Sequence, residues 1–227
     1  LGSLKVPFYK IASAENIHFP LLKKVAKTNK PIIISTGMIS IKELDEVVSY
    51  VRKLGAKNIT LLKCTTEYPA KPKESNILTI PYLKKRYKCD VGLSDHTPGI
   101  GVSIAAIALG ASVIEKHLTL NRKDGAIDSF FSLEPDEFKS LVNESRSAHE
   151  SLGKIKIEAT KSEIKYLKYR RSIYVAEDIK KNEKFTKSNL KVIRPGLGLH
   201  PKFYESIIGK KSKKALKKGT AMKKSFL

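Results

Sequence analysis

Two short segments constrain the fold of this chain most strongly, residues 91–97 (VGLSDHT) and residues 112–118 (SVIEKHL). Each is a brief apolar run that ends in polar residues and is bounded by a turn signal or by helical spacing. This pattern is typical of a parallel strand whose body is buried and whose carboxyl end faces a cleft. The two segments therefore predict a parallel sheet with polar chemistry along one edge.

The ends of these segments carry residues suited to bind a metal ion. Side chains alternate along a strand, so Ser94 and His96 share one face of their strand, and Val113, Glu115 and His117 likewise share one face of theirs. Neighbouring parallel strands lie about 4.8 Å apart. At that spacing the two histidines can hold one divalent cation, with Asp95 and Glu115 nearby. A lone histidine is more often an ordinary core or surface residue, but two histidines at equivalent strand ends favour a metal site.

Three similar apolar runs precede these segments, at residues 8–13, 31–36 and 58–65. Helical spacing separates the runs, and this alternation of strand and helix is the rhythm of βαβ units in a parallel sheet. Polar residues follow every strand, as in (β/α)₈ barrels, whose active sites are built from the strand ends. A doubly wound sheet would bind ligands at one switch point, and no G-x-G-x-x-G follows any strand. We therefore expect an α/β fold of the (β/α)₈ TIM-barrel type, incomplete because only about five of the eight units are present.

The predicted helices have recognisable beginnings. Ser40 and Glu43 have the spacing of a capping box ahead of an apolar helical pattern. Pro81 is expected to begin the next helix, since proline is favoured in the first turn. A long helix over residues 134–152 opens with acidic residues, as the helix dipole prefers.

The pattern changes near Lys161 to short β-like runs separated by turns, at residues 171–176, 178–183 and 190–195. About 60 residues form too small a core to be very stable alone. We expect three parts: residues 1–155 as barrel, residues 156–165 as a linker, and residues 166–227 as a small β-rich domain.

The chain is strongly basic, with a formal net charge of +22. From Lys161 onward there are 20 Lys and Arg against 5 Asp and Glu. Such charge attracts phosphates on nucleic acids or small anions, but the lysines are scattered and lack interleaved stacking aromatics, so nucleic acid is an unlikely partner. With two cysteines and no signal or membrane-spanning pattern, we expect a cytoplasmic protein that does not enter membranes.

The chain resembles the sialic acid synthase family, and the matching segments occur in family order over nearly the whole length. They are residues 9–13 (YKIAS), 34–38 (ISTGM), 63–65 (KCT), 68–69 (YP), 92–97 (GLSDHT), 114–117 (IEKH) and 193–196 (IRPG). The resemblance implies a (β/α)₈ barrel followed by a small antifreeze-like (SAF) domain. The family's first three strands, with a Glu, a Lys and an Asn of the active site, have no counterpart here. We therefore expect little or no turnover from this chain alone.

Within the family, residues 128–135 and 198–204 are most similar to the pseudaminic acid synthase branch. Thr66 stands where N-acetylneuraminate synthases usually have Asn, and legionaminate synthase stays open as an alternative. The family condenses phosphoenolpyruvate with an acetamido sugar aldehyde and releases phosphate. For the pseudaminic acid branch, the resemblance implies a 2,4-diacetamido-2,4,6-trideoxyhexose as the sugar.

The resemblance also implies roles for individual residues. His96 and His117 would hold Mn²⁺ or Mg²⁺. Glu115 would act as a catalytic base or orient water, or alternatively would fix His117 as an outer carboxylate, and Glu15 is a second catalytic candidate. The expected substrate-binding residues are Lys10, Ser13, Ser35 and Ser94 for phosphoenolpyruvate, and Thr66, Tyr68, Asp128 and Arg194 for the sugar. Arg194 would reach the barrel of a partner subunit, in a domain-swapped homodimer.

A hypothesis of another class remains beside the enzyme. A chain with about five barrel units and a basic tail could be a non-catalytic remnant, or could bind RNA or acidic glycans. Salt dependence discriminates between these, because RNA binding weakens steeply with added salt, whereas metal binding by two histidines does not.

Overall fold

Five parallel strands form one sheet in the order β1-β2-β3-β4-β5, as the sequence predicted. The computed structural model describes residues 4–227. The strands are β1 (Tyr9–Ile11), β2 (Ile32–Ser35), β3 (Ile59–Cys64), β4 (Asp90–Asp95) and β5 (Ile114–Lys116). Within the described residues the outer strands β1 and β5 each pair with one neighbour, so the sheet is a five-stranded part of a barrel-type arrangement.

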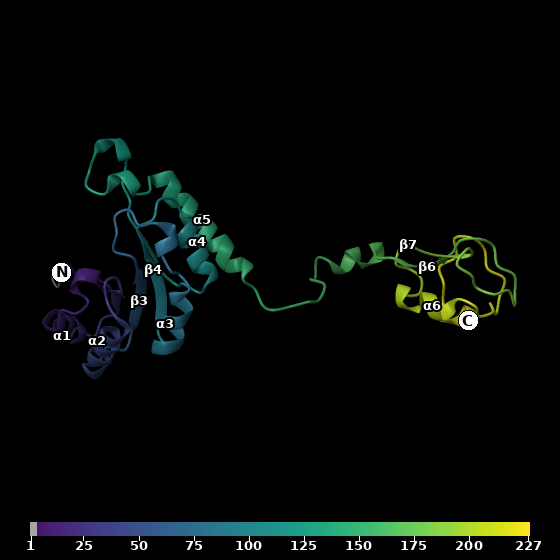
Figure 1. Ribbon diagram of the computed structural model, residues 1–227, viewed down its shortest axis with the longest axis horizontal. Helices are drawn as coiled ribbons and strands as arrows, with labels where there is room; N and C mark the ends of the chain where they lie inside the picture. Colours follow the sequence, from purple (N-terminus) through teal and green to yellow (C-terminus); the bar gives the residue numbers. More distant parts are fainter. Residues whose placement is uncertain (1–3) are drawn as a thin grey trace. The chain divides into compact units, whose positions relative to one another are not determined.

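Helices connect the strands and cover one face of the sheet (Figure 1). The helices of this unit are α1 (Phe19–Ala26), α2 (Ile41–Lys53), α3 (Thr79–Tyr87), α4 (Gly101–Ala108) and α5 (Pro135–Ser151). Ile34, Leu61 and Val91 of the sheet pack in one buried cluster with Val47 of α2 and Leu83 of α3. This apolar layer stabilises the sheet and leaves the opposite face free to carry polar residues.

The starts of the helices follow local capping chemistry. At α2 the Glu43 amide donates to Ser40 Oγ, and the Ser40 amide donates to Glu43 Oε2, so the predicted capping box is confirmed. The prediction that Pro81 begins α3 was wrong by two residues, because α3 begins at Thr79. Proline is tolerated anywhere in the first turn, where backbone N–H groups have no partner within the helix.

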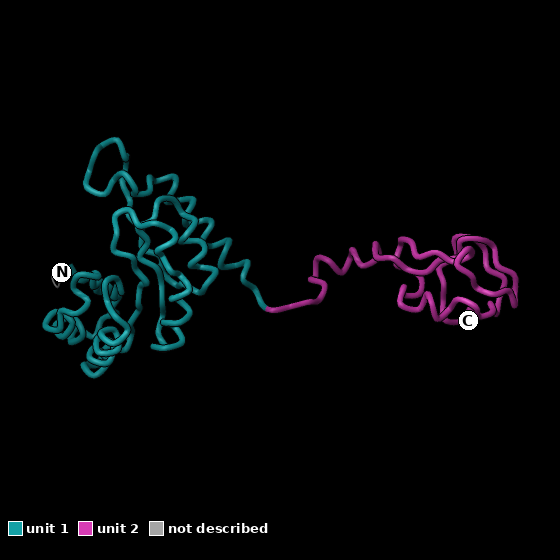
Figure 2. The backbone as a smooth tube through the Cα atoms, viewed as in Figure 1, with its two compact units in different colours: residues 1–154 teal, residues 155–227 magenta. Residues whose placement is uncertain are grey.

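A second compact unit spans Ile155–Leu227, after a first unit of Leu1–Lys154 (Figure 2). Its strands β6 (Ser172–Val175) and β7 (Leu190–Ile193) pair antiparallel, and it also holds the short helix α6 (Tyr204–Ile207). Phe185 and Ile173 are completely buried in a separate apolar core. The unit is therefore a small domain with a core of its own.

The β-like run predicted over residues 178–183 is not a strand. Only Ile179 makes an isolated bridge there, to Leu216. A turn at Lys181 and Asn182 interrupts the run, and Asn182 has a positive φ of 69°, a left-handed conformation that ends regular pairing. In the described part of the chain, no helix is both long enough and apolar enough to cross a bilayer.

Candidate active site

The carboxyl ends of β3, β4 and β5 place three polar side chains in one row. Cys64 lies opposite Ser94 in the β3–β4 register, and Ser94 lies opposite Glu115 in the β4–β5 register. Parallel pairing in register puts such residues on the same face. We refer to the face that carries this row as the site face, and the expectation that the strand ends carry polar groups is confirmed.

A hydrogen-bonded cluster of three residues lies on the site face. Ser94 Oγ donates to Glu115 Oε1 over 2.7 Å, and Lys10 Nζ lies 3.3 Å from the same carboxylate oxygen. The Lys10 and Glu115 side chains remain 27% and 42% exposed. The structure thus brings together Lys10 of β1, Ser94 of β4 and Glu115 of β5, with an ammonium group accessible to an anion.

Two further serines lie at the ends of β1 and β2. Ser13 Oγ accepts a hydrogen bond from the Gly37 amide over 3.1 Å. Ser35 Oγ is buried and has no hydrogen-bond partner among the described residues, which is costly unless a ligand supplies an acceptor. Asn16 joins the two strand ends, because its side-chain amide donates to the carbonyls of Ser35 and Gly37 over 3.2 and 3.0 Å. The sequence analysis missed Asn16, since only the folded chain shows that it links two strands.

Position 37 requires glycine because neighbouring side chains leave no room for a Cβ atom. A Cβ atom placed there would lie 2.2 Å from Thr66 Oγ1 and 2.6 Å from Ser13 Oγ. Only glycine lets the backbone approach these hydroxyls so closely. Thr66 Oγ1 and Ser13 Oγ therefore both lie close to Gly37, and the role of Thr66 stays a prediction.

The two histidine rings lie side by side at the ends of β4 and β5. Their centroids are 5.3 Å apart with an interplanar angle of 84°. The Tyr68 ring lies 4.3 Å from the His96 ring and 5.7 Å from the His117 ring. Phe131, which the sequence analysis did not single out, packs 5.0 Å from His117. The aromatic rings form a wall around the pair and limit its contact with water.

The protonation of the two histidines is set by different neighbours. His96 Nδ1 lies 2.8 Å from the Thr65 carbonyl, and a carbonyl only accepts, so Nδ1 carries the proton and Nε2 presents a lone pair. Burial alone lowers the pKa of His96, but hydrogen bonds with Cys64 and Thr65 raise it overall. Burial and the nearby His96 lower the pKa of His117, which favours the neutral imidazole that binds metals.

Cys64 is a buried thiol at one end of the row, next to Ser94. Burial by itself raises the pKa of this thiol, but hydrogen bonds with His96, Ser13 and Ser94 bring it down to about 7. The pattern that revealed the other site residues also applied to Cys64, since it ends β3 as Ser94 ends β4.

The proposed ligands of a divalent cation are His96 and His117, and this role stays a prediction. Within the described residues no group of three or more His, Cys, Asp or Glu is arranged to hold a metal ion. Asp128 Oδ2 lies 3.9 Å from His117 Nδ1, which suits an outer partner that orients the ring. Imidazole nitrogens are suitable ligands for Mn²⁺ or another borderline cation whose remaining positions are taken by water or substrate.

Two predicted residues are not joined to this cluster. Among residues 4–227 no hydrogen bond or ion pair connects the Glu15 carboxylate to another site residue, and the side chain is partly exposed. Arg194 is exposed and lies directly after β7 in the second unit. The roles of both residues stay predictions.

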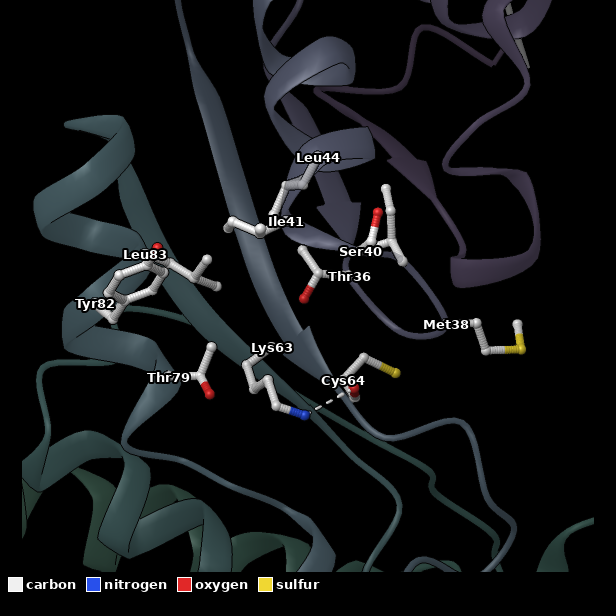
Figure 3. Close-up of a pocket in the computed structure, with 11 residues that line it drawn as sticks. Thr36, Met38, Ser40, Ile41, Leu44, Lys63, Cys64, Thr79, Tyr82 and Leu83 are labelled. Carbon is white, nitrogen blue, oxygen red and sulfur yellow. Dashed lines mark hydrogen bonds between the residues drawn. The ribbon is translucent and has the colours of Figure 1, made fainter.

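A cavity of about 510 Å³ lies beside the end of β3, between α2 and α3 (Figure 3). Met38, Ile41 and Tyr82 give it an apolar wall, and Lys63 contributes a cation whose pKa burial lowers. Lys63 Nζ donates to the Cys64 carbonyl over 2.9 Å. Cys64 lines this cavity, but the histidines, Ser94 and Glu115 do not, so the cavity does not include the histidine pair.

The chain is similar to known proteins over almost its whole length. The NeuB family matches residues 1–157, and the SAF domain matches residues 170–227. The chain is 46% identical to the N,N'-diacetyllegionaminic acid synthase of Campylobacter jejuni, covering 92% of this chain and 64% of that protein. It is 42% identical to the pseudaminic acid synthase of Helicobacter pylori, covering 98% and 66%. The chain thus spans a little under two thirds of the length of these relatives.

A solved structure supports the same relationship. The N-acetylneuraminic acid synthetase of Leptospira borgpetersenii, in complex with citrate, superposes with a TM-score of 0.69 and 35% identity, covering 74% of this chain and 58% of that one. The order of strands, the residues at their ends and these similarities agree, and the chain belongs to the NeuB family of sialic acid synthases, followed by a SAF domain.

Proposed function

We propose that the intact gene product is a nonulosonic acid synthase of the pseudaminic acid type. In this proposal it condenses phosphoenolpyruvate with a 2,4-diacetamido-2,4,6-trideoxyhexose and releases phosphate, as a transferase that forms a carbon–carbon bond on a complete (β/α)₈ barrel. The reducing cytoplasm is the proposed compartment, because Cys64 and Cys89 are both free thiols. The observation that carries the proposal is the cluster of Lys10, Ser94 and Glu115 next to the two histidines.

The proposed reaction balances without an oxidant. C3 of phosphoenolpyruvate attacks the aldehyde carbon, so a carbon–carbon bond forms and the aldehyde oxygen takes up a proton. Water adds to C2, and the bond between C2 and the phosphate oxygen breaks, which releases inorganic phosphate. The chain therefore needs an anion cradle, a group that handles the proton of water, and a group that polarises the aldehyde.

The residues of the site face are suited to these tasks. The Lys10 ammonium is accessible to a carboxylate or phosphate, and the Ser35 hydroxyl has a free donor for one of its oxygens. Glu115 accepts from Ser94 and lies beside Lys10, a position from which its carboxylate could orient water or take its proton. His96 and His117 would hold Mn²⁺ or Mg²⁺, which supplies the charge that polarises the aldehyde.

N,N'-diacetyllegionaminic acid is a second candidate product. The sequence identities support this candidate. The chain is 46% identical to the N,N'-diacetyllegionaminic acid synthase of C. jejuni, and 41% and 42% identical to the pseudaminic acid synthases of C. jejuni and H. pylori. The two candidate functions differ in the sugar that the site would accept. Tyr68 and Asp128 lie beside the histidines, where the proposal places the aldehyde.

The test is phosphate release by the intact gene product with phosphoenolpyruvate, Mn²⁺ and each of the two hexose precursors in turn. We expect turnover with the precursor of pseudaminic acid and loss of that turnover after chelation. Replacement of either His96 or His117 by Ala should abolish turnover, and the double change should add little, since residues that act as a unit are not additive. Independent, multiplying losses would contradict a shared ion, and turnover only with the legionaminic acid precursor would establish the second candidate.

A further inference from the structure

An ion pair is buried directly behind the two histidines. Asp95 ends β4 and Lys116 ends β5, and the two lie opposite each other in the strand register. His96 and His117 are the next residues along the chain. Asp95 Oδ2 lies 2.9 Å from Lys116 Nζ, and each side chain is 1% exposed. Because side chains alternate along a strand, this pair points away from the site face.

The Asp95 carboxylate is fully hydrogen-bonded. Oδ1 accepts from the Thr97 amide over 2.9 Å and from Thr97 Oγ1 over 2.7 Å. Oδ2 accepts from Ser103 Oγ of α4 over 2.6 Å, in addition to Lys116. Lys116 also donates to the Thr97 carbonyl. Every polar group of Thr97 is thus engaged, and the residues on both sides of His96 are held in place.

His117 is held from the same pair. Its backbone follows Lys116, whose ammonium is fixed by Asp95 and by the Thr97 carbonyl. The His117 carbonyl accepts from the Leu133 amide over 2.9 Å. The chain on each side of the His117 ring is therefore anchored, and one anchor is shared with His96.

A buried ion pair is often no more stabilising than apolar residues of the same size, but its geometry is well defined. We propose that Asp95 and Lys116 are positioning residues, which fix the distance and orientation of the His96 and His117 rings for a divalent cation. This inference rests on the metal site in the proposed function. Groups that hold metal-binding side chains in place commonly have a large effect on the affinity for the metal.

The test compares Mn²⁺ affinity, measured by isothermal titration calorimetry, between the intact gene product and its Asp95→Asn/Lys116→Met variant. The double change removes both charges together, so no buried charge is left unpaired, and far-UV circular dichroism checks that the fold is kept. We expect Mn²⁺ to bind about 10-fold more weakly, at the lower end of the cost of losing a group that hydrogen-bonds a metal ligand directly, because Asp95 and Lys116 act through the backbone.

Two single variants complete the design. Ser103→Ala removes one hydrogen bond to Asp95 from α4 and touches neither histidine, so it should weaken Mn²⁺ binding by a smaller factor even if the double variant does not fold. Val48→Ala is the matched control, because Val48 is 2% exposed in the apolar layer beneath α2. It should lower thermal stability and leave Mn²⁺ affinity unchanged.

The outcomes separate this inference from the proposed function. Mn²⁺ binding that disappears in His96→Ala and weakens in the two network variants, but not in Val48→Ala, supports it. Unchanged affinity in a folded double variant overturns it and leaves the metal site standing, and unchanged affinity in Ser103→Ala does so if the double variant fails to fold. Absence of histidine-dependent Mn²⁺ binding in the unsubstituted protein would overturn the metal site and the positioning role together.

Discussion

Two ion pairs between a lysine and a carboxylate lie on opposite faces of the sheet, one between β1 and β5 and the other between β4 and β5. On the site face Glu115 lies 3.3 Å from Lys10, and the two side chains are 42% and 27% exposed. On the other face Asp95 lies 2.9 Å from Lys116, and both are 1% exposed. Burial therefore distinguishes a pair that can exchange its partners for a ligand from a pair that cannot.

The difference has an energetic side. An accessible ion pair is screened by water and contributes little to stability, typically about 0–1 kcal/mol. A buried pair is expensive to break, because removal of one partner leaves a charge without water or counter-ion. Stability should therefore depend on Asp95 and Lys116, and catalysis on Glu115 and Lys10.

The largest effect on stability is expected from Asp95→Ala. It leaves the Lys116 ammonium buried with only a carbonyl to accept from it, and the free energy of unfolding should fall by about 3–5 kcal/mol. Urea denaturation followed by far-UV circular dichroism measures the change. Lys10→Ala is the matched control on the other face, and a similar loss in that variant would refute the distinction between the faces.

Glu115→Gln should show the opposite profile. The amide keeps the shape and can still accept from Ser94, so the free energy of unfolding should change by no more than about 0.5 kcal/mol. Loss of a catalytic base should lower turnover by about 10²- to 10⁴-fold. If Glu115 serves only to orient His117, the variant would instead lose Mn²⁺ affinity, which calorimetry detects separately.

Arg194 extends the comparison to the second unit. In the proposed domain-swapped dimer, Arg194 acts on the site of the partner subunit. Arg194→Ala and His117→Ala proteins, each inactive, should then regain up to about a quarter of normal phosphate release when mixed, because half of the dimers are mixed and each has one complete site. If Arg194 serves its own subunit, each site would still lack one residue and mixing would restore nothing.

The smallest effect is expected at an ion pair on the surface of the helices. Hydrogen bonds from Arg86 and Tyr87 lower the pKa of Asp45. The folded pKa lies below the unfolded one, so the stabilisation is complete above the ordinary aspartate pKa of about 3.9 and is lost as pH falls through the folded value. Asp45→Asn should slightly lower the melting temperature at neutral pH, and the difference from the unsubstituted protein should vanish in acid. A constant difference across the titration would show that the charge of Asp45 is not involved.

Much of the first unit could be predicted because each strand has the same sequence form. A short apolar run is buried between layers, and its first polar residues mark the edge where ligands bind. This form located Ser94 and Glu115 before any coordinates were known. It could not locate Asn16, which follows β1 and whose side chain donates to the Ser35 and Gly37 carbonyls at the end of β2.

Alternation along a strand predicts the face of the sheet on which each side chain lies, but not which residues pack against that face. Asp95 was expected near the metal, whereas its carboxylate is directed to Thr97, Ser103 and Lys116. The second unit was harder for a related reason. Isolated bridges such as that of Ile179 leave no periodic signal, because single residues pair without a strand on either side.

The unpartnered hydroxyl of Ser35 links folding to ligand choice. Folding buries this group, and no atom of residues 4–227 accepts a hydrogen bond from it, an arrangement that costs about 1–3 kcal/mol when nothing else accepts. A ligand that presents an acceptor oxygen to Ser35 Oγ would form the missing hydrogen bond, whereas an analogue without that oxygen would not. The folded chain should therefore prefer an oxygen-rich anion over a less polar analogue, and part of this preference is set by folding before any ligand binds.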